Sequence, residues 1–262
     1  MLDDTILRRT AIAYVFRANL TLDRRENLDF YNRVSVGGVE IPDFSIEGSE
    51  LVLRRRHTVG RGSLEVRVGA FGPAPLRVLV SETLEDRSID LAKETADLVW
   101  EAFSAVWGGK VSEPSVTEVT LDITAGAPGN DSRGFLSASV AHINEGAYAM
   151  LGRPFQGFGL RLMSGPSIQI GADAPAHALL GADTQLRIET FQHDFSQLFI
   201  GASVTWPALT VPKSALPPEV RAQVSGPVVQ INLQAEKPSH YLSLAYDYVA
   251  KNVLAFLRHA AE

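Results

Sequence analysis

The chain has 262 residues, 45% of them hydrophobic and 21% charged, which is enough for one large domain or two of ordinary size with a sizeable core. Its formal net charge of -6 argues against a surface that neutralises the phosphates of nucleic acid or docks on anionic lipid, so neither is expected as a partner. The chain contains no cysteine, which excludes disulfides, thiolate nucleophiles and cysteine metal sites.

The N-terminus, Met-Leu-Asp-Asp, lacks the apolar segment of a secretory signal. The sequence also has no apolar run of about 18 residues, the length needed for a transmembrane helix. These two features predict a cytoplasmic protein.

The first part of the chain reads as an antiparallel meander followed by a helix. A strand is predicted over residues 10–22, after which a polar stretch leads to further short strands separated by Gly, Pro and Ser. These shorter runs cover residues 34–36, 39–41, 51–55, 64–68 and 76–80. An amphipathic helix is predicted over 89–107, with Asp86 or Ser88 as its N-cap and Gly108 at its end.

The second part has a similar order. A strand over 116–123 precedes a glycine-bearing loop at 126–134 and a moderately helical stretch at 136–151. Strands are then predicted over 158–163, 167–170, 185–191, 198–206 and 228–233, with a proline-rich loop at 207–218. A final amphipathic helix covers 242–259.

A strand followed by a long helix occurs in both parts, and one offset of 153 residues aligns the two copies. This offset pairs Leu76 with Val229 and Phe103 with Phe256. We therefore expect an α+β fold of two related units, residues 1–110 and 111–262, each an antiparallel sheet closed by a long C-terminal helix. At the level of topology this order resembles a helix-grip arrangement, in which a curved sheet wraps a long helix, and the resemblance implies an apolar cavity between them.

Two surface features are candidates for binding a partner or ligand. Arg54 and Arg56 belong to a basic run, and Arg61 follows in a Gly-Arg-Gly turn. Charge that guards an edge strand explains this group well, and the functional alternative is a site for an acidic partner. Phe155 and Phe158 could form an apolar lip over a cavity, or they could belong to the core.

A metal site is the sharpest chemical hypothesis, because histidine and carboxylates are the ligands left to a chain without cysteine. His142 and Glu145 lie three residues apart in the predicted helix, and His193 and Asp194 lie at a predicted turn. The four residues would need long-range contacts to meet, and each pair also has an ordinary structural explanation.

The sequence contains no Gly-x-Ser-x-Gly, His-Glu-x-x-His or Ser-x-x-Lys motif, and it implies no cofactor. Whether the chain is an enzyme is therefore left open. The leading prediction is a non-catalytic protein-interaction or scaffold protein that binds a protein partner or another copy of itself. The alternative is a small apolar-ligand-binding protein, or a metal-assisted hydrolase, with its pocket between the sheet and a closing helix.

Overall fold

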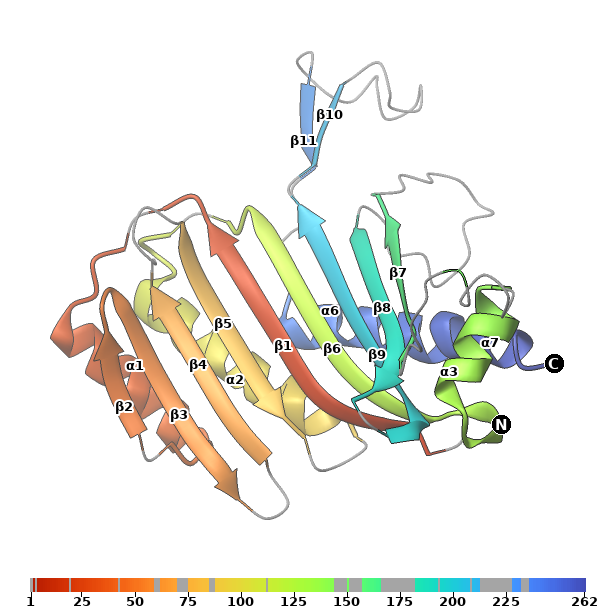
Figure 1. Ribbon diagram of the computed structural model, residues 1–262. Coiled ribbons are helices and arrows are strands. Elements are labelled where there is room, and N and C mark those ends of the chain that lie inside the picture. Colours follow the sequence, from red (N-terminus) through yellow and green to blue (C-terminus); the bar gives the residue numbers. More distant parts are fainter. Residues whose placement is uncertain are drawn as a thin grey trace.

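The computed structural model is α+β, with helices packed on one face of a large antiparallel sheet (Figure 1). It describes residues 2, 4–18, 20–41, 43–58, 62–69, 75–84, 88–111, 113–143, 150, 157–165, 182–192, 194–207, 209–212, 228–231 and 236–262. The predicted strand at 167–170 lies outside these residues.

The described strands form one nine-stranded sheet and a separate pair. The nine strands lie in the order β2-β3-β4-β5-β1-β6-β9-β8-β7, and all adjacent strands are antiparallel. They are β1 Ile6–Phe16, β2 Asp43–Glu47, β3 Glu50–Thr58, β4 Gly62–Gly69, β5 Leu76–Thr83, β6 Val116–Gly126, β7 Gly159–Ser164, β8 Asp183–Phe191 and β9 Asp194–Pro207. The separate pair, β10 Leu209–Pro212 with β11 Val228–Ile231, begins inside the segment predicted as a proline-rich loop.

One helix follows β1, a second follows β5, a group of short helical segments follows β6, and the C-terminal helix comes after β11. They are α1 Arg24–Val36, α2 Asp90–Trp107, the short turns η1 Pro128–Asn130 and α3 Ser132–Gly134, the π-helical η2 Phe135–Val140, and a C-terminal helix made of α6 Pro238–Tyr248, the π-helical η4 Val249–Val253 and α7 Leu254–His259. The segments α1, α2 and α6 lie behind the sheet in Figure 1.

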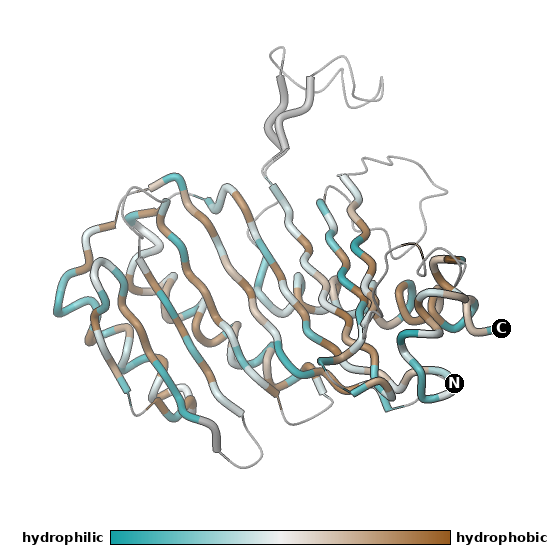
Figure 2. The backbone as a smooth tube through the Cα atoms, in the orientation of Figure 1, coloured by the Kyte–Doolittle hydropathy of each residue, from teal (hydrophilic) through white to brown (hydrophobic). Residues whose placement is uncertain are grey.

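Hydrophilic and hydrophobic residues alternate along the sheet strands (Figure 2). Alternation sends successive side chains to opposite faces, so one face buries its residues under the helices. The core cluster under the helices draws on both predicted units, for example Leu53 and Phe103 from the first and Leu121, Ile200 and Leu257 from the second. The boundary at residue 110 falls between α2 and β6 and stays a prediction.

Helix α1 corrects the sequence-based interpretation, which placed a polar stretch at 24–26 and a strand at 34–36. The Asp23 carboxylate accepts hydrogen bonds from the amides of Arg25 and Glu26, so it caps the helix. Phe30 and Val34, four residues apart, bury one face of it completely. The helical spacing of these two residues outweighs the β-propensity of the short run around Val34.

Helix α2 confirms the predicted span, but its N-cap position is Ile89, and the Ser88 hydroxyl accepts from the amide of Asp90. Its aromatic residues stack with those of the central strand β1: Phe103 lies 5.5 Å from Phe16 between ring centroids. The C-terminal helix docks beside it, where the amide of Ser239 donates to Asp97 at 2.8 Å and Lys237 pairs with Glu101 at 2.7 Å.

The duplication at an offset of 153 residues is not confirmed. It equates β5 with β11, yet β5 lies between β4 and β1 in the sheet, whereas β11 pairs only with β10. It also equates Phe103, which is 1% exposed, with Phe256, which is 45% exposed. A different regularity is present: outward from the central β1–β6 pair, the strands run β1-β5-β4-β3-β2 on one side and β6-β9-β8-β7 on the other.

Candidate functional site

On the sheet face that turns toward the viewer in Figure 1, no helix of the described residues lies over the central strands, and we call it the open face. A hollow of about 410 Å³ lies on its C-terminal half. We call this hollow the arginine pocket; its lining residues are Arg9, Thr120, Asp122, Arg161, Gln185, Arg187, Gly201, Ala202 and Ser203.

The strand register explains why these charges meet. Arg9 of β1 is opposite Asp122 of β6, and Asp122 is opposite Gly201 of β9. Gly201 is in turn opposite Arg187 of β8, and Arg187 is opposite Arg161 of β7. Residues in direct register share a face of the sheet. Three arginines and one carboxylate therefore form a single row across five strands.

Gly201 gives the row its hollow floor. A Cβ placed on Gly201 would lie 3.1 Å from the Phe199 ring and 3.7 Å from Oδ1 of Asp122. A glycine in the interior of a strand weakens the strand and often marks a place where another molecule approaches the backbone closely. Because Gly201 has no side chain, the space between Asp122 and Arg187 stays open.

The arginine charges are only partly compensated. The Arg9 guanidinium lies 3.7 Å from Asp122, and the Arg187 guanidinium lies 3.5 Å from Glu189 and 4.8 Å above the Phe199 ring. Arg161 forms no ion pair with any residue that the structure describes. Arg9 and Arg187 stay 47% and 58% exposed, so a ligand can reach both.

Asp122 is the least exposed charge in the row. Burial raises the pKa of its carboxyl group above the ordinary value for aspartate, and the nearby charges of Arg9 and Arg187 oppose that rise. The side-chain amide of Gln185 and the hydroxyls of Thr120 and Ser203 complete the polar lining. The described lining has no histidine, so it offers no serine–histidine pair for nucleophilic catalysis. Its chemistry is suited to binding carboxylate or phosphate.

A β-bulge in β1 brings a further arginine to this face. Leu7 pairs with Ile123 and Arg9 with Asp122, which leaves Arg8 as the extra residue. Its guanidinium donates to the hydroxyl of Thr124 at 3.0 Å, and Thr124 lies two residues from Asp122 on the same face. Consecutive residues of a regular strand would instead point to opposite faces.

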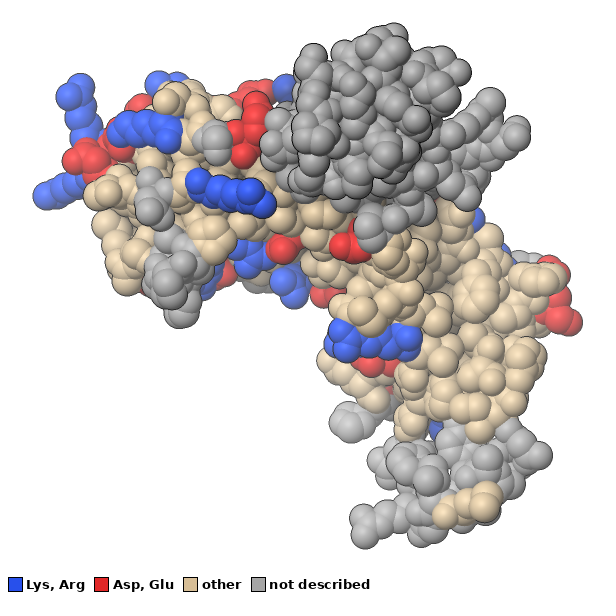
Figure 3. All heavy atoms as spheres, turned by 90° about the horizontal axis from the view of Figure 1, so that it is seen from above, with Lys and Arg blue, Asp and Glu red and all other residues tan. Residues whose placement is uncertain are grey.

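The sequence-predicted residues Arg54 and Arg56 lie at the other end of the open face, where the arginines are surrounded by carboxylates. The Arg54 guanidinium lies 3.0 Å from the Glu65 carboxylate and donates two hydrogen bonds to the Glu47 carboxylate. The Arg56 guanidinium lies 3.3 Å from the Asp43 carboxylate. Seen from above, side chains of both signs crowd this end of the molecule (Figure 3). Arg61 lies outside the described residues.

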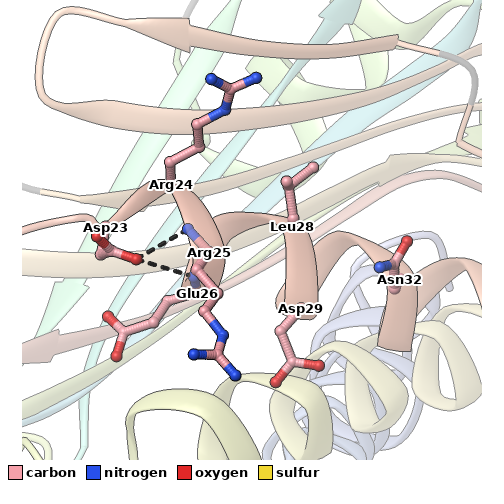
Figure 4. A pocket seen from close by; sticks show the side chains of 7 residues that line it. All are labelled: Asp23, Arg24, Arg25, Glu26, Leu28, Asp29 and Asn32. Atoms are coloured by element: carbon pink, nitrogen blue, oxygen red, sulfur yellow. Dashed lines mark hydrogen bonds between the residues drawn. The ribbon is translucent and has the colours of Figure 1, made fainter.

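Another hollow, of about 900 Å³, follows the outer side of α1 between Asp23 and Asn32. Its side chains point in different directions from one stretch of helix and do not converge on a common point (Figure 4). Asp23 caps the helix there, and Glu26 accepts from the Trp107 indole at 3.1 Å and pairs with Lys110. This hollow is therefore the surface of a helix rather than a binding site.

The structure brings few of the other sequence candidates together. Phe158 is half-buried against the core cluster, and Phe155 lies outside the described residues. Of the metal candidates, Glu145 and His193 also lie outside them. His142 has a positive φ of 52°, and Asp194 accepts hydrogen bonds from Ser196 and Gln197, which lowers its pKa. The described residues contain no group of three or more potential metal ligands, and the metal site stays a prediction.

Comparisons with known proteins give no family. No family model matches the chain, and no curated protein matches it significantly. One solved structure that it resembles is described as the crystal structure of Tle4-Tli4 complex, with 10% sequence identity, coverage of 82% of this chain and 84% of that chain, and a TM-score of 0.20. No conclusion about fold or function follows from so low a TM-score. Within the described residues, none of the helices has the length and apolar character needed to cross a membrane.

Proposed function

We propose that the protein is a non-catalytic protein-interaction protein whose arginine pocket binds acidic side chains of a partner protein. The observation that carries this proposal is the row of Arg9, Arg187 and Arg161 around a single half-buried carboxylate, on a sheet face over whose central strands none of the described helices lies. Guanidinium groups bind carboxylates bidentately, and they lose less hydration than ammonium groups do when an interface forms.

The floor of the pocket supports a ligand that reaches the sheet itself. Gly201 leaves the backbone accessible between the charged side chains, and Ser203 and Thr120 offer hydroxyls beside it. An extended acidic segment could place carboxylates against the arginines at both ends of the row. The whole chain has a net charge of -6, whereas the lining of the pocket contains three arginines and one aspartate, so the pocket is a local positive region on an acidic protein.

A peptide titration tests the proposal directly. We expect an alternating glutamate–glycine peptide to bind the full chain saturably, and the glutamine–glycine counterpart to bind at least about tenfold more weakly, because only the carboxylates can form charge-assisted hydrogen bonds. Equal binding of the two peptides, or none, would rule out an acidic partner at this pocket.

Gly201→Val separates the pocket from the charge of the face as a whole, because it fills the floor and keeps every arginine. We expect it to weaken binding of the glutamate peptide about tenfold or more, while circular dichroism shows an unchanged fold. The matched control is Ser45→Val on β2, at the other end of the open face, which should bind as the wild type does. If Gly201→Val binds normally, the site lies elsewhere.

Self-association is the other partner that the sequence predicts. Sedimentation equilibrium of the wild type and of Gly201→Val distinguishes the two cases. If the wild type is a dimer and Gly201→Val is a monomer, the occupant of the pocket is a second copy of the chain. If both are monomers, the partner is a different protein.

A further inference from the structure

A second hollow, of about 280 Å³, lies on the opposite side of the sheet from the arginine pocket, between α2 and the helix-covered face. Its lining comes from the end of α1, from β3 and β5, and from the first half of α2. The residues are Gly37, Gly38, Val39, Arg55, Glu82, Leu91, Glu94, Thr95 and Leu98.

The floor of this hollow is a buried ion pair. Arg55 and Glu82 follow Leu53 and Val80 by two residues, so they share the face that those core residues occupy. Leu64 of β4 stands in register between them, and Nη2 of Arg55 donates to Oε1 of Glu82 above it. The two side chains are 4% and 5% exposed, and no other ion pair within the described ranges is buried on both sides.

The walls are apolar and the mouth is polar. Val39, Leu91 and Leu98 face the hollow, and Glu94 and Thr95 come from the same turns of α2. A Cβ placed on Gly37 would lie 2.2 Å from Cδ1 of Leu98, so a glycine is needed for this wall to close against the end of α1.

A buried ion pair is expensive to form because both charges lose their hydration, and apolar residues of similar size often give equal or greater stability. Arg55 and Glu82 also line an accessible hollow, where a ligand can reach charges that are already dehydrated and held in place. Interactions with such preorganised charges are stronger than with charges in water.

We propose that this hollow binds a small zwitterion with an aliphatic side chain, of the class of the aliphatic α-amino acids. A ligand with one charge would meet an attractive and a repulsive charge of equal size at the floor. A zwitterion directs its carboxylate to Arg55 and its ammonium group to Glu82 and Glu94, so both of its ends are attracted. The leucines and Val39 accept the aliphatic part.

Isothermal titration with three probes tests the charge requirement. L-leucine carries both charges, 3-methylbutan-1-amine lacks the carboxylate, and 4-methylpentanoate lacks the ammonium group. We expect saturable binding of L-leucine to the full chain, with each of the other two at least about tenfold weaker, because each of them carries only one of the two charges that Arg55 and Glu82 attract. No saturable binding of L-leucine, or equal binding of either analogue, would overturn the proposal.

Two variants test the location. Leu91→Trp fills the hollow from a partly exposed position on α2 and should abolish L-leucine binding, whereas Leu28→Trp, the same change at a similarly exposed position on α1, should retain it. The double variant Arg55→Met/Glu82→Leu removes the charged floor without leaving an isolated buried charge, and it should also abolish binding. Unchanged binding by Leu91→Trp, or by the folded double variant, would place the ligand elsewhere. The proposal is independent of the arginine pocket, and peptide binding there would not change its outcome.

Discussion

The two halves of the open face have similar numbers of arginines but different surroundings for them. In the N-terminal half, Arg67 contacts Glu65 at 2.7 Å and Glu50 at 3.0 Å, and Arg54 shares Glu65 with it. In the C-terminal half, Asp122 pairs with Arg9 at 3.7 Å and Glu189 pairs with Arg187 at 3.5 Å, which are longer distances. The number of arginines alone therefore does not indicate a binding site. We place the proposed site where the arginines have fewer carboxylate partners within the sheet.

The helices that cover the two halves differ in how deeply they bury a phenylalanine ring, and removing these rings gives the largest expected change in the free energy of unfolding. Phe103→Ala removes a fully buried ring between Phe16, Trp100 and Trp107, and should lower the free energy of unfolding by about 3–5 kcal/mol. Phe256→Ala removes a ring that is nearly half exposed, and should cost less than about 1 kcal/mol. Urea denaturation of both variants measures the difference. Equal losses would mean that the two closing helices are buried alike and that the offset-based duplication deserves reconsideration.

The next effect is on binding. Arg161→Gln/Arg187→Gln should weaken the glutamate peptide by about tenfold or more, equivalent to about 1.4 kcal/mol, because both charges lie in the row with few partners. The matched variant Arg54→Gln/Arg67→Gln removes two arginines whose charge the sheet already compensates, and it should leave the affinity within about twofold. Fluorescence anisotropy of a labelled peptide measures both. A larger loss of peptide affinity in the variant Arg54→Gln/Arg67→Gln would show that the peptide binds to the N-terminal half.

Salt concentration should change the peptide affinity of the C-terminal half more than it changes the stability of the chain. The peptide affinity depends on exposed charges, so it should fall several-fold between about 50 and 500 mM salt as the Debye length shortens. The stability of the chain should change little over that range, since exposed ion pairs such as Arg56 with Asp43 contribute about 0–1 kcal/mol each. Affinity that is independent of salt would contradict recognition by the arginines.

The smallest effect is a pH dependence of opposite sign in the two halves. The hydrogen bond from Arg67 lowers the pKa of Glu65, so its contribution to stability is present above the ordinary glutamate pKa of about 4.3 and is lost as the pH falls through the folded value. Burial raises the pKa of Asp122, so its contribution is present below the ordinary aspartate pKa of about 3.9 and is lost as the pH rises through the folded value.

Thermal unfolding of Glu65→Gln and Asp122→Asn from about pH 3 to 7 measures these opposite slopes. The wild type should lose its advantage over Glu65→Gln as the pH falls. Asp122→Asn should gain stability relative to the wild type as the pH rises. Parallel profiles for the two variants would show that Asp122 is not in a distinct electrostatic environment.

Periodicity in the sequence was sufficient to predict the elements whose apolar residues recur at the spacing of a strand or of a helix. The strands around Val66, Val78, Leu121 and Ile200 alternate apolar and polar residues, and α2 carries apolar residues at helical spacing, so these elements were predicted correctly. Helix α1 was missed because only two apolar residues, Phe30 and Val34, lie on its buried face beside the polar Asn27, and its cap is a single aspartate. The offset-based repeat is not confirmed, because similar local patterns do not specify which strands pair.

None of the residues that line the arginine pocket was among the site residues predicted from the sequence. Arg9, Arg161 and Arg187 are isolated in the sequence among residues of ordinary composition, and the only local signal is a glycine within the long apolar run around Gly201. The bulge at Arg8 adds a charge to the open face against the two-residue period.

The sequence by itself therefore determined the fold class, the elements with strong periodicity and the absence of cysteine chemistry, because each of these depends on local pattern or composition. Only the tertiary structure decided which charges are neutralised and which remain available. Register between strands brings Arg9 opposite Asp122, 113 residues away, and Gly201 opposite Arg187, and no local pattern encodes that register.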